Sequence, residues 1–241
     1  LMSKVEVERQ FLELFLKKGG LRIARNTEEL FVFKSGRRSP NFVNMGALTD
    51  GESLSKIKWI CGNFIANLLD RNLLEQFEFI FGPSYKGISL AALACEGLSE
   101  LRGINTRYLY DRKEEKTYGD TKMDQIIVGA EYFRPGAKIL IVDDTITTGG
   151  TKFEAIEKLH TLGEHEIVGL VVAVDRQEKM GDAVRVEEKS AAQNIEDQFG
   201  FRVFSILGMQ AVFDRIKNEL PDDIRENWIE YYGKYGVVKL E

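Results

Sequence analysis

Two neighbouring aspartates, Asp143 and Asp144, stand between an apolar run and a turn rich in threonine and glycine. The apolar run predicts a buried parallel strand, and the residues from Lys152 to His160 follow the turn with helical spacing. Backbone N–H groups at the start of a helix bind anions, because the first amides lack partners there. Glycines at 149 and 150 let a ligand approach the backbone closely. Two carboxylates beside such an anion site suit a ligand with both hydroxyl groups and a phosphate, such as a phosphorylated ribose.

Other phosphate-binding loops do not match this segment. Lys152 lacks the preceding spacing of a P-loop, and no expected strand is followed by the G-x-G-x-x-G of a dinucleotide fold. A plain glycine-rich connection with two solvated aspartates remains the alternative. The run V-D-D-T-I-T-T-G-G-T from Val142 to Thr151 resembles the phosphoribosyl-pyrophosphate (PRPP) signature of the type I phosphoribosyltransferases.

Two further segments carry cations next to turn residues. The loop G-P-S-Y-K-G at 82–87 follows an apolar strand and opens a helix, which predicts an anion pocket with Lys86 as a point charge. The charged stretch 111–124 is long for a loop, which is typical of a lid. A closing lid would bring Arg112, Lys113 and Lys116 over a leaving pyrophosphate. The alternatives are an ordinary turn with an exposed lysine and a solvated charged surface.

Two segments suit a flat anionic ring. Arg176, in the D-R-Q-E run after a hydrophobic strand, could fork onto a planar carboxylate. In the stretch 33–44 Phe42 could stack on a flat ring while Lys34 reaches a phosphate. A surface salt bridge and a hairpin turn with surface charges are the respective alternatives.

The elements that must position these residues alternate along the chain. An amphipathic helix ends at Gly19-Gly20, short strands follow at 30–33 and 42–44, and Leu54 to Leu68 show helical spacing. We then expect strands at 77–81, 105–109, 138–142, 167–174 and 202–205, with helices at 87–100, 150–162, 187–199 and 208–219 and a last helical piece from Pro221 to about Tyr232. This alternation predicts βαβ units on a parallel sheet. Ligands bind beyond the carboxyl ends of such strands, so 82–87, 111–124, 143–151 and 175–178 should meet at one cleft.

Taken together, these segments resemble the orotate phosphoribosyltransferases over about residues 8–218, in that family's order. The resemblance implies an α/β fold of the type I phosphoribosyltransferase class: a mainly parallel twisted sheet flanked by helices, in a single domain 1–241 with a small hood at 1–50. It implies transfer of the 5-phosphoribosyl group from PRPP to orotate, giving orotidine 5′-monophosphate and pyrophosphate for pyrimidine biosynthesis. It also implies Mg²⁺ held mainly by PRPP and water, and a homodimer that shares its lids.

The resemblance also assigns roles to residues. It implies catalytic roles for Asp143, Asp144, Lys116, Arg112 and Lys86, and orotate contacts from Phe42, Val43, Thr147 and Arg176. The residues that would contact PRPP are Lys34, Tyr85, Lys86, Arg112, Lys113, Lys116, Tyr118, Asp143, Asp144, Thr145, Ile146, Thr147, Thr148, Gly149, Gly150 and Thr151.

The chain also departs from the family pattern at four places, one of which is Asp120-Thr121-Lys122, where the lid commonly has a pair of glycines. Tyr118 stands where the lid usually has a histidine, and Val43 stands where a second aromatic residue is common. Residues 219–241 extend beyond the usual end, and no task follows for them from the sequence.

Bulk composition narrows the class of protein. A net charge of −5 and a pI of about 5.4 argue against nucleic acid as the main partner. The spacing of Cys61 and Cys95 does not match a metal site, so we expect both to be buried thiols in a reducing compartment. The sequence has no apolar run of 18 residues, so we expect a cytoplasmic protein that does not span a membrane. Two other functions stay open: a phosphoribosyltransferase for a purine or another pyrimidine base, and a non-catalytic nucleotide-sensing protein on the same fold, including one that binds RNA.

Overall fold

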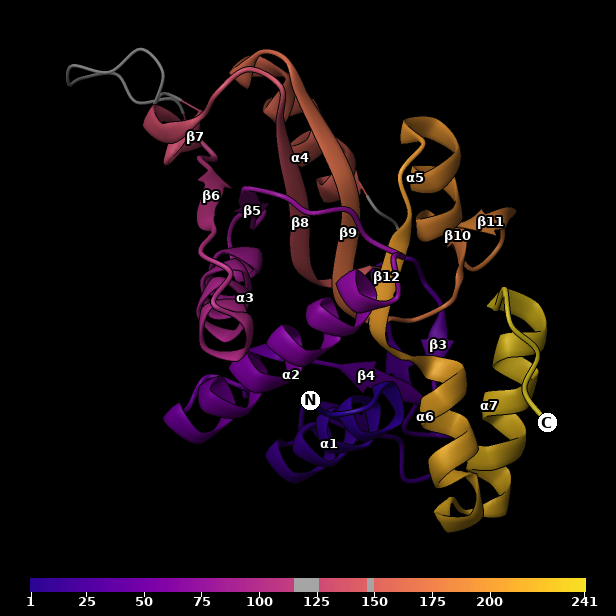
Figure 1. The fold of residues 1–241 in the computed structure, drawn as a ribbon. Helices are drawn as coiled ribbons and strands as arrows, with labels where there is room; N and C mark the ends of the chain where they lie inside the picture. The colour runs from indigo at the N-terminus through magenta and orange to yellow at the C-terminus, as the bar shows by residue number, and fades with distance from the viewer. Residues whose placement is uncertain (115–125, 147–149) are drawn as a thin grey trace.

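The structure is a computed structural model that describes residues 1–114, 126–146 and 150–241 (Figure 1). Within these ranges, six strands form the main sheet in the order β12-β9-β8-β5-β6-β7. All neighbours run parallel except β6 and β7, which pair antiparallel. The strands are β5 (Phe79–Phe81), β6 (Arg107–Asp111), β7 (Ile127–Val128), β8 (Ala137–Ile146), β9 (His165–Asp175) and β12 (Val203–Gly208). The predicted α/β class with a mainly parallel sheet is confirmed.

Helices lie on both faces of the sheet because side chains alternate along each strand. In β8, Leu140 and Val142 belong to one buried cluster, and Ile139 and Ile141 belong to the other. The first cluster includes residues of α1 (Lys4–Lys18), α2 (Gly51–Asp70), α3 (Lys86–Arg102), α6 (Met209–Ile216) and α7 (Asp222–Tyr235). The second includes residues of α4 (Gly150–Leu159) and α5 (Ala191–Phe199).

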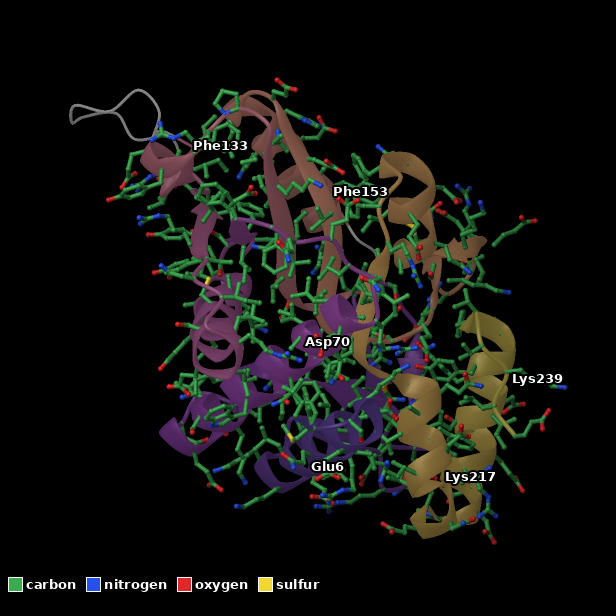
Figure 2. The ribbon with its side chains drawn as sticks, in the orientation of Figure 1. Glu6, Asp70, Phe133, Phe153, Lys217 and Lys239 are labelled. Carbon is green, nitrogen blue, oxygen red and sulfur yellow. The ribbon has the colours of Figure 1, made fainter. Side chains whose placement is uncertain are left out.

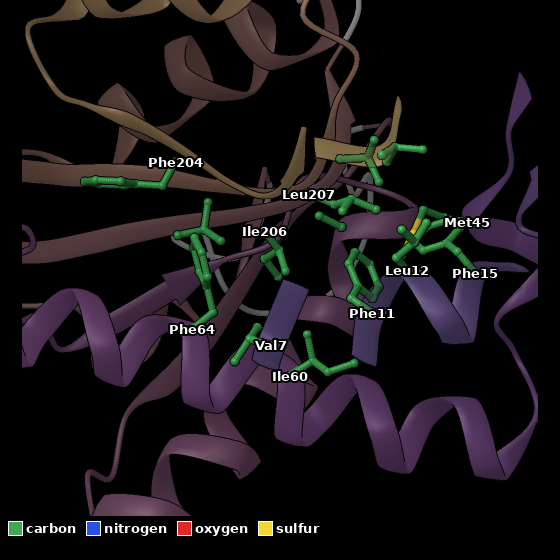
Figure 3. Packing of buried hydrophobic residues seen from close by; sticks show 14 of the residues in the cluster. Val7, Phe11, Leu12, Phe15, Met45, Ile60, Phe64, Phe204, Ile206 and Leu207 are labelled. Carbon is green, nitrogen blue, oxygen red and sulfur yellow. The ribbon is translucent and has the colours of Figure 1, made fainter. Parts of the chain in front are cut away.

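The amino-terminal part packs its own helix onto this core. Ser3 caps α1 by accepting a hydrogen bond from the backbone of Glu6, and Gly19 ends the helix with a left-handed φ of 74°, as predicted. Figure 3 shows Phe11 and Val7 of α1 between α2 and the sheet, close to Ile206. Charged side chains such as Glu6, Asp70 and Lys239 lie on the outside of the molecule (Figure 2).

Short strands follow α1 and form two small antiparallel pairs. These strands are β1 (Leu21–Ile23), β2 (Phe31–Val32), β3 (Arg38–Ser39) and β4 (Asn41–Val43). β1 pairs with β4 and β2 pairs with β3, so the prediction of two strands around one turn was incomplete. Phe42 of β4 lies against Phe31 and Phe33, with ring centroids 5.7 and 6.4 Å apart.

Two predicted boundaries differ most from the structure. Strand β8 does not end at Val142 but continues through Ile146, because its residues pair with β9 up to Asp175. The helix expected over 187–199 begins only at Ala191. The preceding strand β11 (Val186–Ser190) pairs with β10 (Lys179–Gly181), and Ser190 forms a capping box with Gln193.

The carboxyl-terminal helix α7 runs beside α6 at the lower right of Figure 1. Trp228 of α7 is fully buried against Phe213 of α6, with ring centroids 5.7 Å apart. The helix is longer than predicted, since it continues past Tyr232 to Tyr235. No helix among the described residues is both long and apolar enough to cross a lipid bilayer.

Candidate active site

A cavity of about 550 Å³ lies between the short strands and the carboxyl ends of β8 and β9. It joins segments that are far apart in the sequence, as expected for the carboxyl edge of a parallel sheet. Its lining includes Phe33, Lys34, Phe42, Val43, Thr145 and Arg176. Five of the predicted ligand contacts therefore line one cavity at the strand that carries the two aspartates: Lys34, Phe42, Val43, Thr145 and Arg176.

Arg176 enters this cavity from a buried position. Its exposed fraction is 3%, which contradicts the alternative of a surface salt bridge. The Nε–H group donates to Glu178 Oε2 at 2.6 Å, and one Nη2–H group donates to Ser39 Oγ at 3.1 Å. The guanidinium carbon lies 4.8 Å from the ring centre of Phe33. Its Nη1 nitrogen donates to no residue in the described part of the chain, so these N–H groups are available to a ligand in the cavity.

Asp143 and Asp144 lie in β8 and contact Lys152, a lysine to which the sequence assigned no role in the site. Lys152 Nζ is 3.1 Å from Asp143 Oδ2 and 3.9 Å from Asp144 Oδ1, and it also donates to the carbonyl of Thr145. Burial raises the pKa of Asp143 to about 6, against the attraction of Lys152 and with a smaller contribution from Asp144. The site is therefore a compact charged cluster at the carboxyl half of β8.

The loop 82–87 joins this cluster on the other side. Lys86 Nζ lies 4.0 Å from Asp144 Oδ2. A Cβ atom at Gly87 would lie 3.0 Å from Asp143 Oδ1, and one at Gly82 would lie 2.2 Å from the carbonyl oxygen of Gly87. Both positions therefore require glycine for close approach, which supports the anion-loop interpretation over an ordinary turn. Strands β5 and β8 flank the point where strand order reverses, where ligands bind in such sheets.

Comparisons with known proteins agree with this geometry. The phosphoribosyl transferase domain family matches residues 52–202. Orotate phosphoribosyltransferases from Bifidobacterium adolescentis and Clostridium botulinum are 35% and 34% identical over 240 and 237 residues, covering 96% and 95% of this chain and 98% of each relative. The crystal structure of orotate phosphoribosyltransferase from Francisella tularensis superimposes with a TM-score of 0.72 at 29% identity, covering 94% of this chain and 98% of that one.

The chain belongs to the orotate phosphoribosyltransferase family. The match to one relative also reaches into the carboxyl-terminal segment of the chain. The match to the B. adolescentis protein leaves 4% of the 241 residues uncovered, about ten residues, which is fewer than 219–241 contains. At least part of this carboxyl-terminal segment is therefore matched in that family member.

A buried carboxylate lies at the base of the predicted lid. Asp111 is buried at the end of β6 and accepts hydrogen bonds from the backbone of Ser84 at 2.7 Å and from Lys158 Nζ at 2.9 Å. Lys158 also donates to the carbonyl of Arg112 at 3.0 Å. The 82–87 loop, the start of the 111–124 segment and helix α4 are thus joined through one carboxylate. Neither Asp111 nor Lys158 was predicted, because the sequence does not indicate which cation reaches which carboxylate.

The other residues to which the family resemblance assigned a ligand contact are partly exposed, partly buried and partly outside the described ranges. Tyr85 and Lys113 are exposed. The side chain of Ile146 is 2% exposed and packs in the hydrophobic core, so a contact with PRPP would come from its backbone. Gly150 and Thr151 begin α4, with no further description of their side chains. Lys116, Tyr118, Thr147, Thr148 and Gly149 lie outside the described residues.

Proposed function

We propose that this protein transfers the 5-phosphoribosyl group of PRPP to orotate, giving orotidine 5′-monophosphate and pyrophosphate. The observation that carries the proposal is the cavity in which buried Arg176 faces the end of β8. A strongly held guanidinium with donors to spare suits the carboxylate and carbonyl side of orotate. The relatives that bear this enzyme name cover nearly the whole chain. A purine base has no carboxylate for Arg176, which disfavours the main alternative.

We propose that orotate lies between Arg176 and the aromatic side of the cavity. Phe42, with Phe31 and Phe33 around it, offers a flat apolar surface to the ring. Val43 and Thr147 would complete the base contacts. Short strands at residues 1–50 supply this aromatic side, which supports their proposed role as a hood over the base within a single domain.

We assign PRPP to the other side of the cluster. Asp143 and Asp144 would orient the ribose hydroxyls, and the amides of 147–151 at the start of α4 would hold the 5-phosphate. The phosphates would be contacted by a set of mainly cationic side chains: Lys34, Tyr85, Lys86, Arg112, Lys113, Lys116 and Tyr118. Displacement of pyrophosphate builds positive charge on the ribose and negative charge on the leaving group. The aspartates favour the first and the cations favour the second, so catalysis needs positioning and electrostatics without a side-chain nucleophile.

The residues present fit Mg²⁺ that is bound chiefly through the substrate. Among the described residues, no group of three or more histidine, cysteine, aspartate or glutamate side chains gathers as a metal site. Asp143 is ion-paired with Lys152, so it could approach a substrate-bound ion through water. When bound, Mg²⁺ would neutralise charge on the pyrophosphate.

Homodimer formation, lid sharing and a cytoplasmic location also belong to this proposal. Their support is the family resemblance and the absence of a membrane-crossing helix in the described ranges. The lid hypothesis is tested by mixing Lys116→Ala protein with Asp144→Asn protein. If lids act on the partner's site, hybrid dimers regain one intact site and part of the activity. Absence of recovery, once subunit exchange has been verified, shows that each lid serves its own chain.

The activity itself is tested with a panel of bases, PRPP and Mg²⁺. We expect loss of orotate absorbance and release of pyrophosphate, with little reaction of uracil, adenine, guanine or hypoxanthine. A preference for any of these over orotate would contradict the proposed substrate. Binding of PRPP without turnover of any base would favour the nucleotide-sensing alternative.

A further inference from the structure

The carboxyl-terminal helix directs its tyrosine hydroxyls at the segment that carries Arg176. Tyr231 donates to Glu178 Oε1 at 2.6 Å, and Tyr232 donates to the backbone carbonyl of Arg176 at 2.7 Å. A third tyrosine of α7, Tyr235, donates to the carbonyl of Ala183 at 3.1 Å. Trp228, one turn earlier on the same buried face of α7, packs on Phe213 of α6 and holds the helix in place. The fixed helix α7 therefore contacts the segment 176–183 through three tyrosine hydrogen bonds.

Glu178 is the link between this helix and the cavity. Its side chain is buried, and the carboxylate accepts a hydrogen bond from Arg176 on Oε2 at 2.6 Å and one from Tyr231 on Oε1 at 2.6 Å. A second guanidinium, that of Arg37, lies 3.3 Å from Oε1. A buried carboxylate with good partners on both oxygens has a single favourable position. Its partner Arg176 is therefore fixed along its Nε edge, which leaves the Nη1 side for the base.

The tail after α7 holds the turn between Arg176 and Glu178. Gln177 has a left-handed φ of 55°, which is uncommon for a residue with a side chain. Its carbonyl accepts from the backbone of Val237 at 2.9 Å, and its Oε1 accepts from the backbone of Gln210 at 2.9 Å. Glu178 also forms an antiparallel bridge with Gly236. Contacts from α6 and the tail thus determine a conformation that the turn would not favour alone.

We propose that Tyr231 and Tyr232 are positioning residues for base recognition: α7 and its tail set the direction of Arg176 and so control affinity for the carboxylated base. The inference rests on the proposed assignment of orotate to this cavity. It gives residues 219–241 a task that the sequence did not indicate. In Figure 1 the upper end of α7 approaches the β10–β11 hairpin, the side on which these contacts lie.

The test compares three variants that each lose one hydroxyl and keep the ring. Tyr231→Phe removes a donor to the buried Glu178 carboxylate, and hydrogen bonds to charged groups carry enough free energy to raise the KM for orotate roughly 10-fold. The KM for PRPP should stay within about twofold, because Arg176 does not contact PRPP in the proposed arrangement. Tyr232→Phe should act in the same direction with a smaller effect. Tyr235→Phe is the matched control on the same helix, with its hydroxyl bonded outside the cavity lining, and should leave both KM values unchanged.

Substrate preference separates positioning from a merely structural role. A displaced Arg176 should reduce the preference for orotate over uracil in Tyr231→Phe, whereas general loosening of the fold would lower the melting temperature and leave that preference intact. An unchanged orotate KM and unchanged preference in both Tyr231→Phe and Tyr232→Phe would overturn the inference. Should Tyr231→Phe fail to fold, Glu178→Gln, which removes the charge held by Arg176, is measured with the same expectation. A wild-type protein inactive on orotate would instead refute the proposed function, and the wild type is assayed first.

Discussion

The two halves of the candidate site are built in opposite ways. On the base side, Arg176 and Glu178 are 3% and 6% exposed and have several partners each. On the pyrophosphate side, Tyr85 is 71% exposed and the side chain of Lys86 is 60% exposed, with its nearest carboxylate 4.0 Å away. The proposed base pocket is held by buried partners before any substrate arrives, whereas Tyr85 and Lys86 on the proposed pyrophosphate side stand in solvent.

This difference agrees with the role that we propose for each half. Orotate is a flat, rigid anion, so donors that are already fixed lose little entropy on binding it. Pyrophosphate is a leaving group that must depart. The nearby cationic side chains are therefore most useful when they bind it most strongly in the transition state, as negative charge develops on it. Asp143 and Asp144 lie between the halves, with Lys152 as a buried counter-charge.

The largest expected effect is the loss of base recognition in Arg176→Ala. A charge-assisted pair to a charged partner is worth about 2–4 kcal/mol, so kcat/KM for orotate should fall about 10²-fold or more. The KM for PRPP should change little in steady-state assays. Arg185→Ala, at an exposed arginine of the following hairpin, is the control. Equal losses for both substrates would show that Arg176 does not contact the base.

Lys86→Met tests the opposite side. Because the side chain is exposed and its partner is 4.0 Å away, we expect an unchanged melting temperature and a kcat that falls more than roughly 10-fold, as for charge stabilisation in the transition state. Lys56→Met, at an exposed lysine 3.2 Å from Glu52, controls for loss of a surface cation. A normal kcat in Lys86→Met would support the exposed-turn interpretation of this loop.

The buried cluster predicts a pH dependence. With the pKa of Asp143 raised to about 6, kcat/KM for PRPP should fall as pH decreases through that value and the carboxylate is protonated. Lys152→Met removes the attraction that lowers this pKa, so the acidic limb should move to higher pH. Lys138→Met, at the other end of β8 and paired with Glu75, should leave it in place. If kcat/KM fell at the same pH in the wild type and both variants, Lys152 would have no influence on the group that titrates.

The same raised pKa has a consequence for stability. The folded state disfavours the ionised form of Asp143 relative to the unfolded value of 3.8, so it binds more protons than the unfolded state between about pH 4 and 6. The contribution of this group is therefore most favourable at low pH and decreases as pH rises through that window. Urea unfolding of the wild type and Asp143→Asn across this range measures the difference, and a parallel pH profile in both would contradict the assignment.

The smallest expected effect concerns Tyr85. Because this side chain is 71% exposed, Tyr85→Ala should change the free energy of unfolding by less than about 0.5 kcal/mol. Any change in KM for PRPP would then report ligand contact alone. A loss above about 1 kcal/mol in urea unfolding would show that the pyrophosphate side is packed more firmly than its exposure indicates.

Local patterns predicted much of this protein. Gly19 ended the first helix because a left-handed residue favours glycine, and the apolar run before Asp143 indicated a buried strand. The spacing of Gly82, Lys86 and Gly87 indicated an anion loop, and the structure supplies the close approaches that require both glycines. These features depend on neighbours in sequence, so periodicity and residue type were sufficient.

Long-range partners could not be predicted in the same way. Strand β8 continues through Ile146 because β9 pairs with it, and the helix after β11 starts late because β10 pairs with that strand. Whether Arg176 would be a surface group or a buried one depended on Glu178, and through it on a tyrosine 53 residues further along the chain.

The sequence by itself determined the alternation of helices with the parallel strands of the main sheet, the glycine turns and the charged residues at strand ends, because hydrophobic periodicity and turn chemistry are local. Only the tertiary structure decided which polar groups pair: the ion pairs of Lys152 with the aspartates and of Lys158 with Asp111, and the hydrogen bond from Tyr231 to Glu178. Such pairs form between groups brought together by packing, and their energies depend on burial that no local pattern records.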